Sequence, residues 1–543
     1  MTVRWLWLAA GLLAVWAIAE AFAQDGEAPP AIEQWGISNS ASLMPPQLPA
    51  GGLAPGALIR IRGWRLGPAD PSQISVRIRR GDTRVETQAL SSEENQIEAL
   101  LPRNAPLGNA MLQVVKNGSA SLEWPVAIVK SSFGAFSRNG EGWGPGDIAN
   151  ASGTPNSATR PARPGELVTL TGTGLGNRAE HFQPQVLVAG SLSKTVRLPA
   201  RNTPRPGIDE IEFAVPEDAP EGCYVPVQVS SAPGVYSNAV TMAINRMGTA
   251  CADPDDWTGG TGSRTIRLGT MALLQTDFLL EPAPRQTVRY PVDIGFANFS
   301  EIAPGALASP MFLFPPLSTC TVYSGTASLH SLTSPLAMLQ ALPGKALDAG
   351  PAVSVEGAGG NRSLPRERSS HRNYWAVIGG HSPAPGAREL PLFLLPGEYQ
   401  VATPGGADVH ALHAPVRLGP PLVWENRGQL TEVDRARGAT LSWRSAMAGP
   451  QHFVLIVAMN ADSRSGALGV CACLAPASAG TFRIPAYALA NIPPSPAHPR
   501  GFPLNLLLLA ELPEVRSEPI TGTDVDRILS FGASISGRTV RFQ

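Results

Sequence analysis

Several short clusters in the sequence contain residue types that can bind a metal ion. Asp408, His410 and His413 form D-x-H-x-x-H, and carboxylate and imidazole groups are common metal ligands. On a strand, however, Asp408 and His410 share one face while His413 points to the other, so we expect ordinary surface residues there. A second cluster is acidic and consists of Asp253, Asp255 and Asp256. It lacks the EF-hand loop pattern, which favours a solvated linker over structural calcium, and the sequence predicts no cofactor.

A glycine-rich stretch, G-E-G-W-G at residues 140–144, superficially suggests a phosphate-binding loop. Such a loop lies between a strand and the N-terminus of a helix, and the Pro145-Gly146 pair that follows argues against a helix. We therefore expect an interdomain loop. Trp143 in this loop could pack between two domains, which is the favoured interpretation. The alternative is that Trp143 contacts a partner, for example by stacking on a sugar ring.

Signals for hydrolytic catalysis are weak. The sequence contains neither H-E-x-x-H nor the G-x-S-x-G nucleophile elbow. Residues 191–194, SLSK, fit S-x-x-K but have no companion motifs. The carboxylate pair of a glycoside hydrolase is defined by its separation in space, which a sequence does not give. We predict a non-catalytic protein, and the alternative is a secreted hydrolase with its active site in residues 252–543 and the repeats described below as accessory domains.

Composition narrows the fold class. Gly (55) and Pro (53) make up a large share of the 543 residues, and charged residues account for only 16%. Helical bundles avoid so much proline, and disordered chains contain less apolar sequence than the 43% found here. A turn-rich, mostly β protein of several domains remains. The net charge is −1, and the densest basic patch (Arg77, Arg79, Arg80 and Arg84) fits a solvated strand face, so no nucleic-acid partner is predicted.

An internal repeat dominates the first half of the sequence. Residues 53–68 (LAPGALIRIRGWRLGP) match residues 162–177 (ARPGELVTLTGTGLGN), and residues 96–115 match residues 210–229. In both copies Pro-Gly starts a turn, because Pro fixes φ and Gly permits positive φ, and a strand-like run follows. Gly63 and Gly172 occupy equivalent positions, where a bulge or a close backbone approach is expected. Each copy of about 100 residues is large enough for one β-sandwich core.

The repeated pattern P-G-x-L-V-x-L-x-G-x-G-L-G, followed by I-x-F-x-V-P-x-D-A-P-x-G, resembles the IPT/TIG type of immunoglobulin-like domain. It is more similar still to a group of secreted acidobacterial (Solibacter-type) proteins that carry two such domains in tandem. Their linker resembles the segment here that runs from Gly134 through Asn139 and Pro145 to Asn150. The resemblance covers residues 33–250 and implies tandem immunoglobulin-like sandwiches. It implies no catalytic residues, and a fold of this kind does not define a function.

Five cysteines occur, at positions 223, 251, 320, 471 and 473, so at least one thiol is unpaired within the chain. A Cys223–Cys251 bridge would close a loop of about 28 residues, worth roughly 3–4 kcal/mol in the chain-entropy model. Such a pair is also part of the pattern that the resemblance implies. Cys471 and Cys473 share one strand face, and either could reach Cys320; we assign Cys320 to Cys473, although the spacing does not decide. A zinc site is the weaker alternative, because C-x-C lacks a second pair at metal spacing.

The N-terminus has the features of an export signal. Arg4 precedes the apolar run WLWLAAGLLAVWAIA, and Ala21-Phe22-Ala23 fits the small-x-small site of signal peptidase. The apolar run is short for a membrane span, so we expect cleavage after Ala23 and no stable membrane insertion afterwards. The sequence thus predicts a secreted or cell-surface protein, with periplasmic retention as an alternative.

These observations predict an all-β protein in which tandem immunoglobulin-like sandwiches precede one or two further β-rich domains. The expected divisions are a signal peptide (1–23), two IPT/TIG-type domains (24–131 and 132–250), a β-rich domain (251–419) and a sandwich-like domain (420–543). The expected function is binding, adhesion or structural support. The partner would be an unidentified polysaccharide or surface protein.

Overall fold

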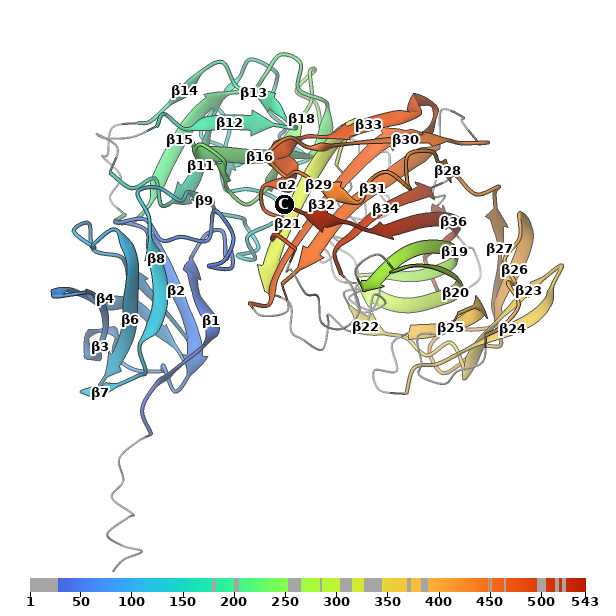
Figure 1. Cartoon of the computed structure of the whole chain (residues 1–543), viewed down its shortest axis with the longest axis horizontal. Helices are drawn as coiled ribbons and strands as arrows, with labels where there is room; N and C mark the ends of the chain where they lie inside the picture. The colour runs from blue at the N-terminus through green and yellow to red at the C-terminus, as the bar shows by residue number, and fades with distance from the viewer. Residues whose placement is uncertain are drawn as a thin grey trace, which may run out of the picture.

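The computed structural model describes residues 28–177, 182–199, 205–251, 265–283, 286–302, 315–326, 344–368, 373–381, 389–447, 449, 452–462, 465–495, 504–512, 517–519 and 524–543. The predicted signal peptide and the acidic cluster at residues 253–256 lie outside these ranges. As predicted, the protein is almost entirely β. Two sandwiches lie side by side along the N-terminal half, and a larger, strongly curved sheet forms the C-terminal half (Figure 1). None of the helices in the described ranges is long and apolar enough to cross a membrane.

The first sandwich is one folded sheet of eight strands with the order β1-β2-β5-β4-β3-β6-β7, and β8 pairs with β6. Its strands are β1 (Ala31–Asn39), β2 (Leu58–Trp64), β3 (Ile74–Arg80), β4 (Thr83–Glu93), β5 (Gln96–Leu100), β6 (Gly108–Lys116), β7 (Ser119–Ala120) and β8 (Trp124–Ile128). Strand β4 belongs to both layers, because it pairs with β3 at Thr83–Gln88 and with β5 from Ala89 onward, with a register shift between Ala89 and Ser91. Alternating apolar residues of both layers enclose the core, as the burial pattern of β2 illustrates.

The second sandwich has two separate sheets. One has the order β10-β11-β15-β14, with β9 on β11, and the other has the order β13-β12-β16-β17, with β18 on β16. The strands are β9 (Gly134–Ala135), β10 (Ile148–Ala149), β11 (Leu167–Thr173), β12 (Gln185–Val188), β13 (Ser191–Leu192), β14 (Val196–Arg197), β15 (Asp209–Ala214), β16 (Gly222–Ala232), β17 (Val235–Tyr236) and β18 (Val240–Ile244). The repeated blocks of the sequence therefore form equivalent strands, β2 and β5 in one copy and β11 and β15 in the other.

The repeated glycines lie where two backbones approach closely. A Cβ on Gly63 would lie 2.0 Å from the carbonyl oxygen of Ala31, and one on Gly172 would lie 2.3 Å from that of Gly134. In each copy the glycine lets the first strand of the sandwich approach its antiparallel neighbour closely. The turn glycines Gly56 and Gly165 both have positive φ, at 83° and 80°. The predicted roles of these two pairs of glycines are confirmed.

The C-terminal half is built on a ten-stranded sheet. Its order is β21-β32-β31-β34-β36-β19-β20-β22, with β25 on β20 and β35 on β36. Its strands are β19 (Ile266–Ala283), β20 (Gln286–Ile302), β21 (Thr319–Thr326), β22 (Lys345–Ala346), β25 (Asn373–Gly380), β31 (Phe453–Ala461), β32 (Ala467–Pro476), β34 (Leu506–Leu512), β35 (Ser517–Pro519) and β36 (Arg527–Thr539). Strands β19 and β36 are parallel neighbours from opposite ends of this half, so the sheet contains strands from both sides of residue 420. The division proposed at that residue stays a prediction.

Two smaller sheets cover this large sheet and create two cores. A four-stranded sheet covers β19, β20 and β25, and a three-stranded sheet covers β21, β31, β32 and β34 together with helix α2 (Ala486–Leu489). The covering strands are β23 (Ala352–Gly357), β24 (Gly360–Pro365), β26 (Gly397–Thr403) and β27 (Leu412–Leu418), and β28 (Val423–Trp424), β30 (Ala439–Arg444) and β33 (Thr481–Ile484). Two short strands, β29 (Glu432–Val433) and β37 (Arg541–Phe542), form a separate parallel pair.

Candidate functional site

The two sandwiches are joined by a buried side-chain amide. Asn39, at the end of β1, is 1% exposed. Its Nδ2 donates to the carbonyl oxygens of Ser132 (3.2 Å) and Thr173 (3.1 Å), and its Oδ1 accepts from the backbone N–H groups of Ala41 and Ser42. Because a buried amide with four satisfied bonds holds both backbones in one geometry, the sandwiches are fixed relative to each other.

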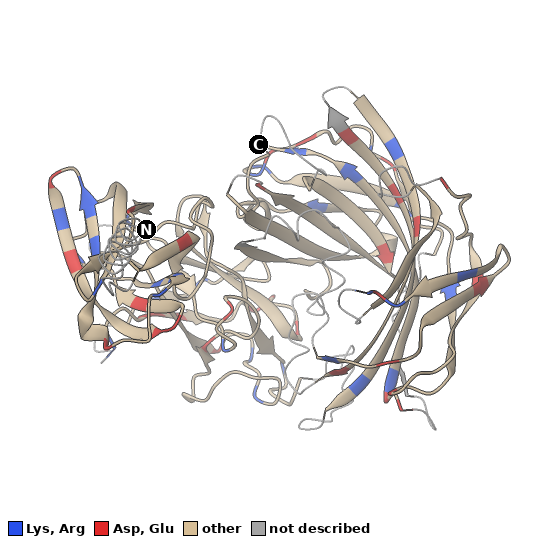
Figure 2. Ribbon diagram, turned by 90° about the horizontal axis from the view of Figure 1, so that it is seen from below, with Lys and Arg blue, Asp and Glu red and all other residues tan. Residues whose placement is uncertain are grey.

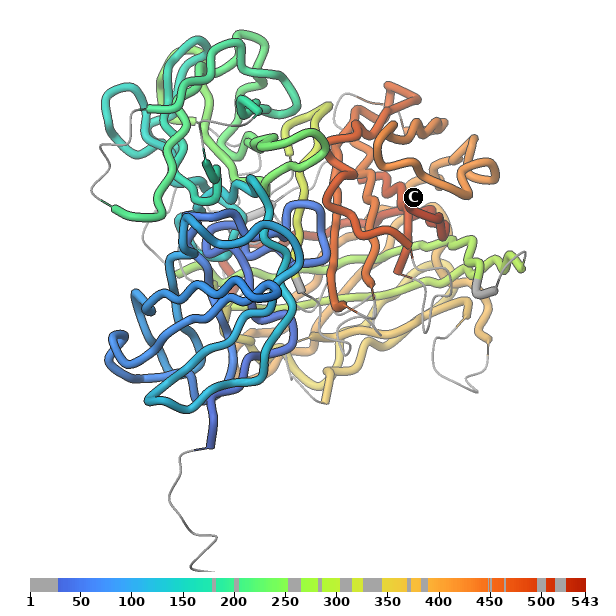
Figure 3. Tube along the Cα trace, turned by 60° about the vertical axis from the view of Figure 1, so that its left-hand side comes forward, coloured from blue at the N-terminus to red at the C-terminus, as the bar shows by residue number. Residues whose placement is uncertain are grey.

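The C-terminal half is attached to the same junction. The Nδ2 of Asn491, which is fully buried, donates to the carbonyl oxygens of Tyr236 and Ser237 at 3.1 and 3.2 Å. An apolar cluster contains residues of all three parts: Met44, Leu48 and Ala50 from the first sandwich, Val235 from the second and Ala467 from the large sheet. The three parts lie next to one another in Figure 3. The N-terminal sandwiches therefore pack against the C-terminal half and are not joined to it by a linker alone.

The glycine-rich loop at residues 140–144 belongs to this junction. The Nδ2 of Asn238 donates to the carbonyl oxygen of Gly142 at 2.7 Å, and a Cβ on Gly142 would lie 2.6 Å from the Ser42 carbonyl oxygen of the first sandwich. Strand β10 follows the loop where a phosphate-binding loop would require a helix. Trp143 is half-buried in this interdomain loop, and its contact with a partner stays a prediction.

A cavity of about 310 Å³ opens between the two sheets of the second sandwich, beside the same junction. Its lining residues are Ser131, Leu175, Phe182, Gln183, Pro184, Val196, Arg197, Leu198 and Ser231. Phe182 is 40% exposed at this site, and the Gln183 side-chain amide donates to the Val196 carbonyl oxygen. One N–H of Arg197 faces Glu212 at 3.4 Å, and a guanidinium has five N–H donors in total. The cavity thus combines an exposed aromatic ring with a rim of hydroxyl, amide and guanidinium groups, the composition of a small-ligand pocket.

The arginine-rich patch of the first sandwich is a network of ion pairs. Arg77 contacts Glu86 at 3.1 Å, and Arg79 makes two hydrogen bonds to Glu123, at 3.0 and 2.7 Å. The bond from Arg79 holds the pKa of the Glu123 carboxyl below its usual range. Charged residues of both signs are scattered over the molecule, as Figure 2 shows. A shallow cavity of about 380 Å³ lies at this patch, and its lining includes Glu86 and Glu123 beside the arginines.

The structure does not bring the side chains of Asp408, His410 and His413 together as a metal site. Asp408 accepts a bond from the backbone of Asp348, whereas the Nδ1 and backbone N–H of His410 both contact Asp524. His413 lies exposed on β27, opposite Ala402. Within the described residues, the one group of side chains close enough to hold a metal ion is Cys320, Cys471 and Cys473, whose sulfur atoms lie within 4.8 Å of one another. Two of these three sulfurs are already joined in a disulfide, so the group does not fit a metal.

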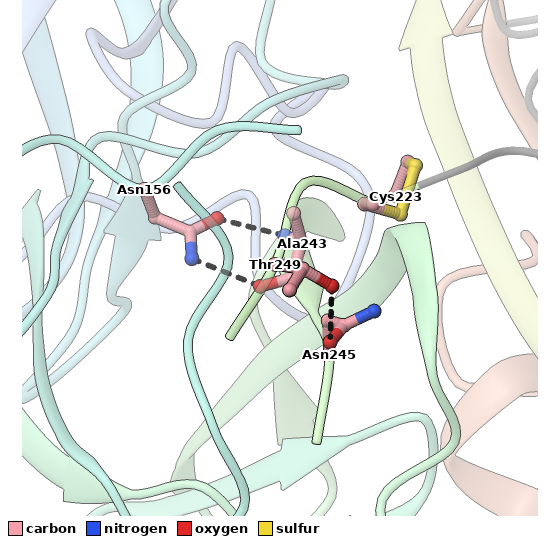
Figure 4. Close-up of a disulfide and its surroundings, with 6 residues drawn as sticks. Asn156, Cys223, Ala243, Asn245 and Thr249 are labelled. Atoms are coloured by element: carbon pink, nitrogen blue, oxygen red, sulfur yellow. Dashed lines mark hydrogen bonds between the residues drawn. A yellow bond between two sulfur atoms is a disulfide. The ribbon is translucent and has the colours of Figure 1, made fainter. Parts of the chain in front are cut away.

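The cysteines form two disulfides, Cys223–Cys251 and Cys320–Cys473, and leave Cys471 free and buried. Figure 4 shows Cys223–Cys251 next to strand β18, where Ala243 exchanges bonds with the side chain of Asn156. This disulfide ties the start of β16 to the segment that leaves the second sandwich. Cys320 and Cys473 lie directly opposite each other on β21 and β32, which explains why Cys473 and not Cys471 is the partner.

A serine, a histidine and a glutamate meet on the covered side of the large sheet. Ser445 donates from its hydroxyl to Oε1 of Glu511 and accepts from the backbone N–H of Met447 at 2.9 Å. Glu511 is 2% exposed; burial raises its pKa, while the bond from Ser445 and the nearby charge of His452 act in the opposite direction. Ser445 therefore bonds to a carboxylate and not to an imidazole, unlike the nucleophile of a Ser-His-Asp triad.

A second buried carboxylate has a structural role. Asp293 on β20 is fully buried, and its Oδ2 accepts from the backbone N–H groups of Phe393 and Leu394 at 2.6 and 2.9 Å. Burial raises the pKa of Asp293, and the two backbone bonds lower it. The carboxylate anchors the 389–395 segment, whose Leu392 and Leu395 side chains are 51% and 59% exposed.

No family model matches this sequence, and no curated protein matches it. Among solved structures, the chain is similar to a Bacteroides thetaiotaomicron protein of unknown function at 12% identity and a TM-score of 0.15, which covers 51% of this chain and 47% of that one. It is also similar to domains 4–9 of surface layer protein SbsC (10% identity, TM-score 0.19, 94% of this chain and 66% of that one). A third similar structure is the surface glycan-binding protein PbSGBP-B from Prevotella bryantii, at 15% identity and a TM-score of 0.13. The match covers 38% of this chain and 40% of that one. The chain spans about half the length of the first of these, and TM-scores this low carry no argument about function.

The residues that stand out in the structure carry no local sequence signal. Phe182 lies in an irregular segment. The carbonyl groups that Asn39 contacts, and the partners of Asp293 and Glu511, lie far from them in sequence. Among the residues described above, only the cysteines have a distinctive chemistry and also a spacing from which disulfide pairs can be predicted.

Proposed function

We propose that this protein is an exported, non-catalytic binding protein that presents its tandem sandwiches to a polysaccharide. The pocket at Phe182 is the observation that carries the proposal. A phenyl ring offers an apolar surface to the C–H face of a sugar ring, and the surrounding hydroxyl, amide and guanidinium groups can bond its hydroxyls. The volume of about 310 Å³ is at the small end for ligand pockets and suits one or two sugar units.

The rigid junction supports this proposal. The pocket contains Ser131, and the neighbouring Ser132 donates from its hydroxyl to the carbonyl oxygen of Ala50 at 2.7 Å and accepts from Asn39 through its own carbonyl. A site whose walls are held by buried hydrogen bonds loses little entropy when a ligand binds. The immunoglobulin-like family membership and the export signal belong to the same proposal, and the two disulfides are compatible with an oxidising compartment.

The test is binding of the purified protein to a panel of soluble polysaccharides, measured by affinity electrophoresis and then by calorimetry. Phe182→Ala should weaken binding about tenfold or more, since aromatic anchors dominate the affinity of such sites. Leu192→Ala is the matched control, because Leu192 is 53% exposed in the same sandwich but does not line the pocket. Equal binding by wild type and Phe182→Ala would place the ligand elsewhere. Absence of binding to the whole panel would overturn the polysaccharide proposal.

A hydrolase is the second candidate, and the Ser445–Glu511 contact is the observation that favours it. In such an enzyme Glu511 would take the hydroxyl proton of Ser445, and a raised pKa suits a general base that works near neutral pH. Wild type, Ser445→Ala and Glu511→Gln would be compared on chromogenic esters and glycosides. Turnover by wild type that both variants lose would support an enzyme, and no turnover by wild type would remove this candidate.

A further inference from the structure

Three sulfur atoms lie together inside the core beneath β28, β30 and β33. Cys320 is 1% exposed, and Cys471 and Cys473 are fully buried. The Sγ of the free cysteine, Cys471, lies 3.6 Å from the Sγ of Cys473, which is bonded to Cys320. This separation is close to van der Waals contact between two sulfur atoms. A free thiol is thus held directly against one end of a disulfide.

We propose that Cys471 is an internal exchange thiol that opens the Cys320–Cys473 bond and thereby releases strand β21. The Cys471 thiolate attacks Sγ of Cys473, a Cys471–Cys473 bond forms, and the Cys320–Cys473 bond breaks. The electron pair leaves on the sulfur of Cys320, which takes up the proton that Cys471 gave up. The number of disulfides and thiols is unchanged, so no external oxidant or reductant takes part.

The position of Cys320 gives this exchange a structural consequence. Strand β21 is the terminal strand in the order of the ten-stranded sheet, and within the described strands it pairs with β32 alone. The Cys320–Cys473 disulfide is the covalent tie between this edge strand and its neighbour. After exchange both sulfurs of the new bond belong to β32, and β21 is held by hydrogen bonds and packing only. An edge strand released in this way exposes backbone groups that can pair with another strand.

The geometry also explains why the tie stays closed in the folded protein. Residues two apart on a strand are separated by about 6.7 Å, near the upper limit for a disulfide, whereas Cys320 and Cys473 are direct cross-strand partners. Burial raises the pKa of the Cys471 thiol, which keeps it in the unreactive protonated form. Exchange therefore requires β21 to loosen so that water reaches the three sulfurs.

The experiment follows the identity of the free thiol in the full-length protein. The protein is held in graded urea at pH 8, quenched with acid, fully denatured, labelled with N-ethylmaleimide at slightly acidic pH and digested with pepsin. Mass spectrometry then reads which cysteine carries the label. In the native protein the label should fall on Cys471. At urea concentrations that loosen β21, the ratio of label on Cys320 to label on Cys471 should rise about tenfold or more.

Two controls make the outcome decisive. Cys471→Ala lacks the attacking thiol and should show no label on Cys320 or Cys473 at any urea concentration. The Cys223–Cys251 disulfide is an internal control, since it should stay intact if exchange is confined to the three clustered cysteines. Label that remains on Cys471 alone would overturn the proposal. Label on Cys473 would also overturn it, because it would show attack on the Cys320 sulfur and formation of a Cys320–Cys471 bond.

Discussion

The two halves of this protein join their cores in different ways. Each N-terminal sandwich has its own core, and hydrogen bonds from buried side chains such as Asn39 connect one to the other. In the C-terminal half, the two cores lie under one ten-stranded sheet, and strand β19 is hydrogen-bonded to strands on both sides. The first arrangement joins units that each bury their own apolar residues, whereas the second joins units through shared backbone hydrogen bonds. Destabilising substitutions should therefore have different effects in the two halves.

The largest expected effect comes from core truncation. Leu273→Ala on β19 and Ile97→Ala on β5 both remove a fully buried side chain, and each should lower the free energy of unfolding by about 2–5 kcal/mol. Hydrogen exchange read by mass spectrometry should show lost protection in both C-terminal cores for Leu273→Ala, and in the first sandwich alone for Ile97→Ala. Loss confined to the core around Leu273 would mean that the shared sheet does not couple the two C-terminal cores.

The junction amide should have the next largest effect. Asn39→Ala leaves two carbonyl and two N–H groups buried without their partner, which should cost about 2–4 kcal/mol. Urea unfolding followed by hydrogen exchange should then show the first sandwich opening separately from the second. Asn95→Ala, at an exposed turn of the first sandwich, is the control and should leave a single transition. Unchanged coupling in Asn39→Ala would assign the rigid junction to the apolar cluster around Met44.

Asp293 tests whether a polar anchor also matters in the C-terminal half. Asp293→Ala removes the acceptor for two buried N–H groups and should destabilise the protein by about 1–3 kcal/mol, with the greatest loss of protection at residues 389–395. Asp293→Asn keeps an acceptor oxygen and lacks the buried charge, so thermal unfolding should place it close to wild type. Equal destabilisation by both substitutions would show that the negative charge itself holds the segment.

The smallest expected effect depends on pH. Burial raises the pKa of Glu511 in the folded state above its unfolded value, so the folded protein binds this proton more tightly. The resulting stabilisation is fully present below the unfolded-state pKa and is lost as the pH rises through the raised folded-state pKa. The free energy of unfolding of Glu511→Gln, relative to that of wild type, should therefore increase by on the order of 1 kcal/mol between acidic and neutral pH. Urea unfolding at a series of pH values measures this difference. Glu94→Gln, at an exposed turn, should follow wild type throughout.

Local patterns in the sequence predicted the first half of the fold better than the second. Pro55-Gly56 and Gly63 recur as Pro164-Gly165 and Gly172, and turn chemistry acts over a few residues, so the strands that follow could be placed. The parallel pairing of β19 with β36 has no such signal, because it joins segments more than two hundred residues apart. The pocket at Phe182 and the Glu511 cluster were missed for the same reason: their members come together only through tertiary packing.

The apolar cluster at the junction has a consequence for the order in which the chain is made. Met44 and Leu48 are synthesised long before Ala467, which packs against them. The first sandwich can close its own core early, but these side chains stay uncovered until the segment that contains Ala467 has been made. In a shortened chain that ends before Ala467, the first sandwich should therefore be folded, with the apolar side chains of Met44 and Leu48 exposed to solvent. Burial of this patch therefore depends on the strand that contains Ala467, far along the chain from the first sandwich.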